Sequence, residues 1–321
     1  MTEKNFVVGV DVGGQTTKIG VVDARGEVLA QSVIRTDTYG TDAKAYIAAL
    51  ADAVKKVVDD AGKKGEIRGV GVGAPNGNYY SGTIAFAPNL AWAAGGVVEF
   101  SKLLSEQLGG IPVSLTNDAN AAAVGEMTYG VARGMKNFIM ITLGTGVGSG
   151  IVINGQVVYG HDGFAGELGH TNVVRHNGRT CGCGKQGCLE AYCSAIGVAK
   201  TAREWLEASD EPSLLRDCEN ITSKDVYDAA KSGDELAIRV FNYTGALLGR
   251  QFADFVAFSA PEAIVLFGGL ARSKEFLYEP ILNAMNDNLL PIWKGKVKIL
   301  FSQLKESDAA ILGASALAWE L

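Results

Sequence analysis

Three features of membrane, secreted and nucleic-acid-binding proteins are missing from this sequence. No apolar run reaches about 18 residues, so no membrane-spanning helix is predicted. The polar residues 1–5 lead straight into a predicted strand, so no secretory signal is expected. The 29 Lys and Arg residues are outnumbered by 35 Asp and Glu residues, and the net charge of −6 offers no basic surface for a nucleic acid. We therefore expect a cytoplasmic protein with neither a membrane nor a nucleic-acid partner.

Cysteine is scarce, and its positions are informative. Of the five cysteines, Cys181, Cys183 and Cys188 lie close together, shortly after His170. Cys181 and Cys183 are too near each other in sequence for an easy mutual disulfide. Three thiolates and one imidazole form a closed tetrahedral set that suits a structural Zn²⁺. An odd number of cysteines, most of them clustered as metal ligands, fits a reducing cytoplasm. The alternative is a group of reduced structural cysteines without a metal.

Glycine, by contrast, is abundant, and it gathers at the ends of predicted buried strands. Among the 41 glycines, some form three turns of this kind: Gly13–Gly14 after residues 6–12, Gly144–Gly150 after residues 138–143, and Gly268–Gly269 after residues 263–267. Glycine lets a phosphate approach backbone N–H groups closely. In the first turn, Thr16 and Thr17 are further candidate donors, and Asp11 is placed to orient Mg²⁺ through water.

The first two glycine turns belong to segments of the same length and pattern. From Phe6 and from Phe138, a strand, a glycine turn and a second strand follow in step. In the later segment the next turn is Asn154-Gly155, a dipeptide typical of two-residue hairpins, and a strand is expected at 156–159. The repeat predicts two related domains that face one cleft. We place a small α/β domain at residues 1–117 plus 306–321, and a large α/β domain with the zinc site at residues 118–305.

Hydrophobic periodicity predicts an α/β fold for the rest of the chain. Helices are expected at residues 46–60, 98–108, 119–127, 189–208, 235–258 and 309–319. Further strands are expected at residues 19–22, 28–34, 67–72, 111–115, 151–153 and 297–301.

Three polar residues, Asn117, Asp118 and Asn120, lie where a predicted strand ends and a helix begins. Open α/β sheets bind their ligands at the carboxyl ends of strands. The alternative is that Asp118 is only an N-cap, the commonest role of Asp at such a position. Three polar groups exceed what one cap needs, which favours a binding or catalytic site.

The segment from His170 to Glu190 resembles the zinc signature of the ROK family of sugar kinases and related repressors. The Gly-Glu-Leu-Gly-His that ends at His170 is similar to the family's sugar-binding turn, and the resemblance extends over nearly the whole chain. It implies an actin-like, ribonuclease-H-like two-domain sugar kinase fold, with ATP and a sugar in the interdomain cleft. We also expect a homodimer.

The resemblance implies roles for individual residues. Asp118, in Asn-Asp-x-Asn, matches the catalytic base. The matches to the family's sugar ligands are Asn89, Asn117, Asp118, Glu167, His170 and Glu190. The matches to its nucleotide and Mg²⁺ contacts are Asp11, Gly13, Gly14, Thr16, Gly144, Thr145, Gly146, Gly268 and Gly269. His170 would then serve zinc through one ring nitrogen and the sugar through the other.

The implied reaction is transfer of the γ-phosphoryl group of ATP to the 6-hydroxyl of D-glucose, since Leu189–Ala195 resembles the glucokinase branch more than the N-acetylhexosamine kinases. N-acetylglucosamine, N-acetylmannosamine and fructose stay open as substrates, and ADP or polyphosphate as donors. Two positions depart from the family pattern. Gln15 stands where Thr is usual, and Pro75-Asn76-Gly77 replaces Pro-Gly beside the sugar.

A sugar-responsive regulator is the non-enzyme alternative. The family's repressors carry an N-terminal winged helix, whereas here the first predicted strand begins near Phe6 and leaves no room for one. An inactive sugar sensor would lack Asp118 or intact glycine turns, and both are present. We therefore expect an enzyme.

Overall fold

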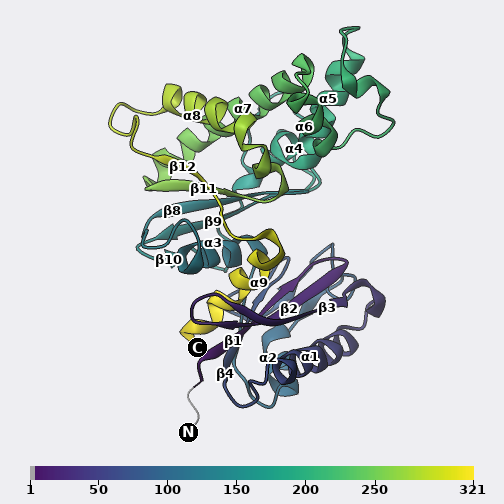
Figure 1. Cartoon of the computed structure of the whole chain (residues 1–321), viewed down its shortest axis with the longest axis vertical. Coiled ribbons are helices and arrows are strands. Elements are labelled where there is room, and N and C mark those ends of the chain that lie inside the picture. The colour runs from purple at the N-terminus through teal and green to yellow at the C-terminus, as the bar shows by residue number, and fades with distance from the viewer. Residues whose placement is uncertain (1–3) are drawn as a thin grey trace. The chain divides into compact units, whose positions relative to one another are not determined.

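Two five-stranded sheets organise the chain, one in each of two units (Figure 1). The computed structural model describes residues 4–321. Unit 1 comprises the chain up to Met135 together with Val157–Gly166 and Gln303–Leu321, and unit 2 comprises Lys136–Gln156 and Glu167–Ser302. The chain thus leaves unit 2 for a short excursion into unit 1 just before Glu167.

The sheet of unit 1 has the strand order β3-β2-β1-β4-β7. Its strands are β1 (Phe6–Val12), β2 (Thr16–Asp23), β3 (Val28–Arg35), β4 (Ile67–Gly73) and β7 (Val113–Thr116). β1 pairs with β2 antiparallel and with β4 parallel, and β4 pairs with β7 parallel. The apolar residues of β1 and β4 are buried, as expected for strands covered on both faces. A separate two-stranded sheet pairs β5 (Ile84–Ala85) with β6 (Val97–Val98).

The sheet of unit 2 repeats this topology in the order β10-β9-β8-β11-β12. Its strands are β8 (Phe138–Leu143), β9 (Val147–Ile153), β10 (Gln156–Val157), β11 (Ala263–Phe267) and β12 (Lys298–Phe301). Again the first two strands of the unit are antiparallel and the next pairs are parallel. The predicted duplication is therefore confirmed. Asn154 and Gly155 have φ of 54° and 78°, the left-handed pair that a two-residue hairpin requires.

Unit 1 owes its compactness to helices that approach the sheet closely. Its helices are α1 (Ala43–Asp60), α2 (Phe100–Gln107), α3 (Asp118–Tyr129) and α9 (Glu306–Ala316). A Cβ added at Gly71 would lie only 1.9 Å from the carbonyl oxygen of Ala314, so α9 rests directly on the strand backbone. Helix α3 also packs closely on α9, where a Cβ added at Gly125 would lie 2.7 Å from the Cα of Gly313. The predicted boundary at 117/118 differs from the observed units because this packing keeps α3 in unit 1.

The helices of unit 2 cover a separate core (Figure 1). They are α4 (Glu190–Cys193), α5 (Ala195–Glu207), α6 (Ser223–Lys231), α7 (Glu235–Ser259) and α8 (Lys274–Asn288). The single helix predicted at 189–208 is wrong, because Ser194 is extended and its hydroxyl caps α5 at the N–H of Gly197. None of the helices formed by residues 4–321 combines the length and the apolar character needed to span a bilayer.

Candidate functional site

The first glycine turn lies between β1 and β2 and is closed by a bond from the Gly13 N–H to the Thr16 carbonyl, at 3.0 Å. A Cβ at Gly14 would lie 3.0 Å from the carbonyl oxygen of Asn89, so this glycine is needed for close packing against the Asn89 turn. Thr17 is fully buried, and its hydroxyl is engaged by Tyr46 at 2.6 Å. The prediction that Thr17 donates to a phosphate is therefore wrong. Its buried hydroxyl instead contacts the core residue Tyr46 next to the turn.

Asp11 and Asp118 lie at the same edge of the unit 1 sheet. Asp11 pairs with Gly73 across β1 and β4, and Gly73 pairs with Thr116 across β4 and β7, two residues before Asp118. Burial, and after it the negative charge of Asp118, raises the pKa of Asp11 from 3.8 to about 6, against the opposing charge of Lys18. Desolvation raises the pKa of Asp118 as well, although its side chain keeps an exposed surface. Both carboxyls at this edge therefore have a raised pKa.

The N-cap of α3 is Asn117, whose Oδ1 accepts the N–H of Asn120 at 2.7 Å. Asp118 is the first helical residue, and its Oδ1 accepts the adjacent N–H of Ala119 at 2.9 Å. The simple reading of Asp118 as the cap is therefore wrong. An exposed carboxylate with a raised pKa remains at the start of α3, where it can accept a proton.

Asn89 lies exposed on a compact turn anchored by buried side chains. Leu90 and Trp92 point into the core, where the Trp92 ring stacks on Tyr46 with centroids 4.6 Å apart. Because the Tyr46 hydroxyl contacts Thr17, one aromatic side chain supports both the Asn89 turn and the first glycine turn.

The excursion at Val157–Gly166 is held by a loop that departs from the family pattern. The Nδ2 of the buried Asn78 donates to the Asp162 carbonyl at 2.6 Å, and the ring of Tyr79 stacks on that of Tyr159 at 4.1 Å. Gly163 has φ +90° and no room for a Cβ beside Asn78. Sequence reasoning noticed the loop but missed Asn78. Asn78 and Tyr79, just after Pro75-Asn76-Gly77, therefore hold the segment that immediately precedes Glu167.

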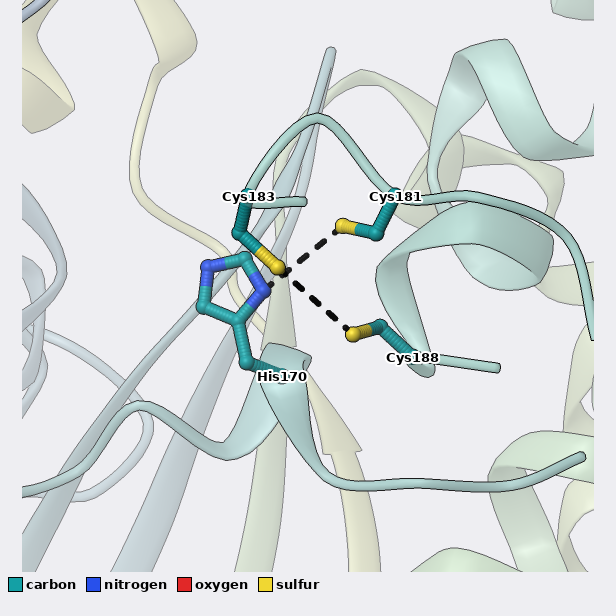
Figure 2. Close-up of side chains that lie close together, drawn as sticks. All are labelled: His170, Cys181, Cys183 and Cys188. Atoms are coloured by element: carbon teal, nitrogen blue, oxygen red, sulfur yellow. Dashed lines mark hydrogen bonds between the residues drawn. The ribbon is translucent and has the colours of Figure 1, made fainter. Parts of the chain in front are cut away.

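His170, Cys181, Cys183 and Cys188 converge on one point (Figure 2), with their ligand atoms all within 4.8 Å of one another. The Nδ1 of His170 lies 3.8 Å from the Cys181 sulfur, and the sulfurs of Cys183 and Cys188 lie 3.7 Å apart. Sulfur and nitrogen ligands about 2.3 and 2.0 Å from one tetrahedral ion are themselves about 3.5–3.8 Å apart. The donor set therefore fits Zn²⁺, with no position left for a water ligand.

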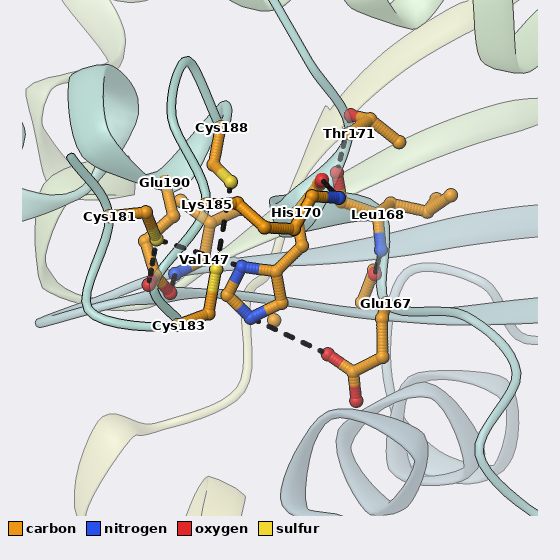
Figure 3. A network of polar contacts seen from close by, with 12 residues as sticks. Val147, Glu167, Leu168, His170, Thr171, Cys181, Cys183, Lys185, Cys188 and Glu190 are labelled. Carbon is orange, nitrogen blue, oxygen red and sulfur yellow. Dashed lines mark hydrogen bonds and ion pairs between the residues drawn. The ribbon is translucent and has the colours of Figure 1, made fainter. Parts of the chain in front are cut away.

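The two carboxylates that flank this cluster differ in their surroundings (Figure 3). Glu167 is exposed, with Oε2 at 4.0 Å from the Nε2 of His170, the ring nitrogen that faces away from the cysteines. Glu190 is half-buried, and its Oε2 accepts the Val147 N–H at 2.9 Å. A Cβ at Gly146 would lie 2.5 Å from the same oxygen. Glu190 is thus packed into the second glycine turn, a contact that its spacing from the cysteines did not predict.

The second and third glycine turns meet at one edge of the unit 2 sheet, where β8 and β11 are neighbours. Gly268 has φ +100°, and a Cβ there would lie 2.6 Å from the Leu143 carbonyl. Beside Gly269 is a pocket of about 310 Å³, lined by Ser223, Lys224, Tyr227, Asp228, Gly269, Leu270, Arg272 and Ser273. Sequence reasoning missed the half of this pocket that α6 contributes. The Thr222–Asp225 capping box was the available signal for that helix.

The candidate residues therefore form one group in each unit. Unit 1 holds Asp11, Gly13, Gly14, Thr16, Asn89, Asn117 and Asp118. Unit 2 holds Gly144, Thr145, Gly146, Glu167, His170, Glu190, Gly268 and Gly269. Within each unit, the strand ends bring the glycine turns and the carboxylates to one edge of the sheet.

Comparison with known proteins identifies relatives of the whole chain. Residues 7–320 match the ROK family. The chain is 37% identical over 318 residues to a glucokinase of Halalkalibacterium halodurans, covering 97% of this chain and 94% of that protein. It is 34% identical over 316 residues to a glucokinase of Thermotoga maritima, covering 97% and 96%. The crystal structure of a ROK family glucokinase from Streptomyces griseus in complex with glucose and AMPPNP has a TM-score of 0.79 and 32% identity, covering 98% of this chain and 100% of that one.

Proposed function

The chain belongs to the ROK family and is a sugar kinase of that family, and we propose that its reaction is the ATP-dependent phosphorylation of D-glucose at the 6-hydroxyl. The two relatives at 37% and 34% identity are glucokinases, and the related structure contains both glucose and an ATP analogue. The resemblance seen in the sequence and the expected actin-like, two-domain α/β kinase fold are confirmed.

The observation that carries the proposal is the state of Asp118. Its carboxylate is free of the capping bond that Asn117 makes, it is accessible, and its pKa is raised. A general base works best when its pKa lies near the operating pH. In the proposed reaction Asp118 accepts the proton of the 6-hydroxyl while that oxygen bonds to the γ-phosphorus. The bond from the γ-phosphorus to the β,γ-bridging oxygen breaks, and ADP leaves.

We assign the sugar contacts to Asn89, Asn117, Glu167, His170 and Glu190. The exposure of Asn89 and Glu167 supports this assignment, as does the outward-facing Nε2 of His170. Asn117 uses Oδ1 for capping, which leaves its Nδ2 for a hydroxyl. Fixed polar groups of this kind discriminate strongly against sugars that leave them unpaired.

We assign the phosphates of ATP to the glycine turns, with Asp11 orienting Mg²⁺. In the second turn Thr145 and Gly146 offer backbone donors, whereas the Gly144 N–H already bonds the Gly146 carbonyl and shapes the turn. Gly268 and Gly269 would lie beside the nucleoside, and the α6 pocket offers an aromatic ring, Tyr227, to the base. Mg²⁺ would neutralise charge that develops on the transferring phosphoryl group. Phosphoryl transfer depends mostly on such positioning and charge stabilisation.

Zn²⁺, held by the His170 and cysteine set, would have a structural role, since the set is closed. The ion would fix the spacing between the η2 turn (Leu168–His170) and the start of α4, and so the spacing between two sugar-binding carboxylates. Formation of a homodimer stays a prediction.

A panel of sugars with MgATP tests the proposal. We expect kcat/KM for glucose to exceed the values for N-acetylglucosamine, N-acetylmannosamine and fructose by at least ~10-fold, a ratio that one or two lost hydrogen bonds supply. The same panel with ADP or polyphosphate tests the donor. Preference for an N-acetylated sugar would overturn the glucose assignment and leave the kinase mechanism intact.

A further inference from the structure

Glu190 contacts the second glycine turn from outside the hairpin that forms the turn. It is the first residue of α4 and stands two residues after the zinc-ligand candidate Cys188. Its Oε2 accepts the Val147 N–H at 2.9 Å, and its Oε1 lies 3.4 Å from the Cys181 sulfur (Figure 3). One carboxylate thus spans from the cysteine cluster to the turn.

The chain just beyond Glu190 contacts the same turn a second time. The N–H of Ala195, at the start of α5, donates to the Gly144 carbonyl at 2.8 Å. Within the turn itself, the Gly144 N–H donates to the Gly146 carbonyl at 3.0 Å. The short segment from Glu190 to Ala195 therefore holds the turn at both ends, by a side chain at Val147 and by backbone at Gly144.

The sequence of the turn is adapted to this contact. Because a Cβ at Gly146 would lie 2.5 Å from the Glu190 Oε2, any larger residue there must displace the carboxylate. At Gly144, by contrast, no heavy atom lies within 4 Å of an added Cβ. Gly146 is thus required by Glu190, independently of any ligand.

We propose that Glu190 is a positioning residue for the β8–β9 turn, fixing the backbone donors that receive the phosphates of the nucleotide. The inference rests on the proposed nucleotide role of this turn and goes beyond the sugar contact assigned to Glu190. The cysteine cluster anchors one end of α4, so the geometry of the zinc site is transmitted to the phosphate-binding turn through one carboxylate.

The test measures nucleotide affinity in the absence of sugar, by calorimetric titration with MgADP. Glu190→Ala should weaken binding by about 10-fold, the scale of one lost hydrogen bond to a charged group. Glu190→Gln should bind within about 3-fold of the natural protein, because its amide oxygen can accept the same Val147 bond. Glu167→Ala, the carboxylate on the other flank, should leave nucleotide affinity unchanged.

A double-mutant cycle separates this role from simple damage. Gly146→Ala should weaken nucleotide binding in the natural background and have little further effect in the Glu190→Ala background, where the space is vacant. Additive effects, or unchanged affinity in Glu190→Ala, would overturn the inference. If Glu190→Ala loses its zinc or its fold, the MgADP affinity of Gly146→Ala alone still tests the inference, because that variant keeps every metal ligand. Failure of the natural protein to bind MgADP at all would refute the nucleotide role of the turn instead.

Discussion

The two glycine turns after β1 and β8 occupy equivalent places in equivalent sheets, yet they are supported differently. In unit 1 the strand itself supplies an acid, Asp11, and a buried hydroxyl, Thr17, supports the turn. In unit 2 the position equivalent to Asp11 is Leu143, and the acid comes from Glu190 in a distant segment. Duplication supplies the same backbone twice. The acid of the first turn is part of its own strand, whereas the acid of the second reaches the turn from α4 and accepts the Val147 N–H.

The largest effect is expected from removing the metal ligands, since only the second turn is backed by them. Cys183 is the exposed member of the set, so Cys183→Ser disturbs packing least. We expect zinc to fall from about one per chain to near zero, and amide exchange of the second turn to accelerate by at least ~10-fold while the first turn keeps its protection. Elemental analysis and hydrogen-exchange mass spectrometry measure both.

The matched control is Cys218→Ser, which removes a half-buried cysteine outside the set and should change neither zinc content nor exchange. Equal loss of exchange protection in both turns would contradict the claim that the cysteine cluster supports only the second turn. Fully active natural protein without zinc would contradict the metal assignment itself.

Replacing the proposed general base, Asp118, should have the largest effect on turnover. Asp118→Asn keeps the size of the side chain and removes its basicity, so kcat should fall at least ~100-fold with a modest change in KM. Steady-state kinetics with saturating MgATP measures this. Asp42→Asn makes the same chemical change at the N-cap of α1, where Asn caps as well as Asp, and should leave kcat unchanged. A near-normal kcat for Asp118→Asn would remove Asp118 from the mechanism.

Equivalent glycines in the two turns should give different kinetic signatures. A Cβ at Gly14 meets the Asn89 carbonyl at 3.0 Å, so Gly14→Ala should displace the proposed sugar turn and raise the sugar KM by about 3–10-fold. Gly146→Ala should instead act on the nucleotide. Gly95→Ala, where no atom lies within 4 Å of the new Cβ, is the control and should leave both KM values unchanged. A Gly14→Ala variant with a raised KM for ATP and an unchanged KM for the sugar would contradict this difference between the two turns.

The smallest effect concerns stability. The folded-state pKa of Asp11, about 6, lies above the ordinary 3.8, so the fold favours the protonated form. The contribution of the protonated Asp11 carboxyl to folding stability is fully present below about pH 4 and is lost as the pH rises through about 6. Asp11→Asn should therefore be more stable than the natural protein at pH 7 by about 1 kcal/mol, less than the full shift converts to because Asp11 is partly exposed. Urea unfolding without MgATP should show no difference at pH 4, and an equal difference at both pH values would contradict this.

Local patterns were sufficient for much of the fold. Alternating buried strands and glycine turns predicted the duplicated sheets, and the cysteine spacing predicted the cluster with His170. Helix α8 was missed because its apolar face is weakly periodic and Pro280 lies within it. Helix α6 was missed although the Thr222–Asp225 capping box marks its start. The excursion at Val157–Gly166 was missed because a chain crossing between units carries no periodic signal.

The sequence by itself determined the residue types at each strand end and the four members of the His170 and cysteine cluster, because backbone periodicity and ligand chemistry are local properties. Only the tertiary structure decided what each acid does. Asn117 takes the capping bond and frees Asp118, and Glu190 reaches Val147 across 43 positions of the chain. Such choices depend on which N–H groups the fold brings within hydrogen-bond distance of a carboxylate, and folding, rather than spacing, sets those distances.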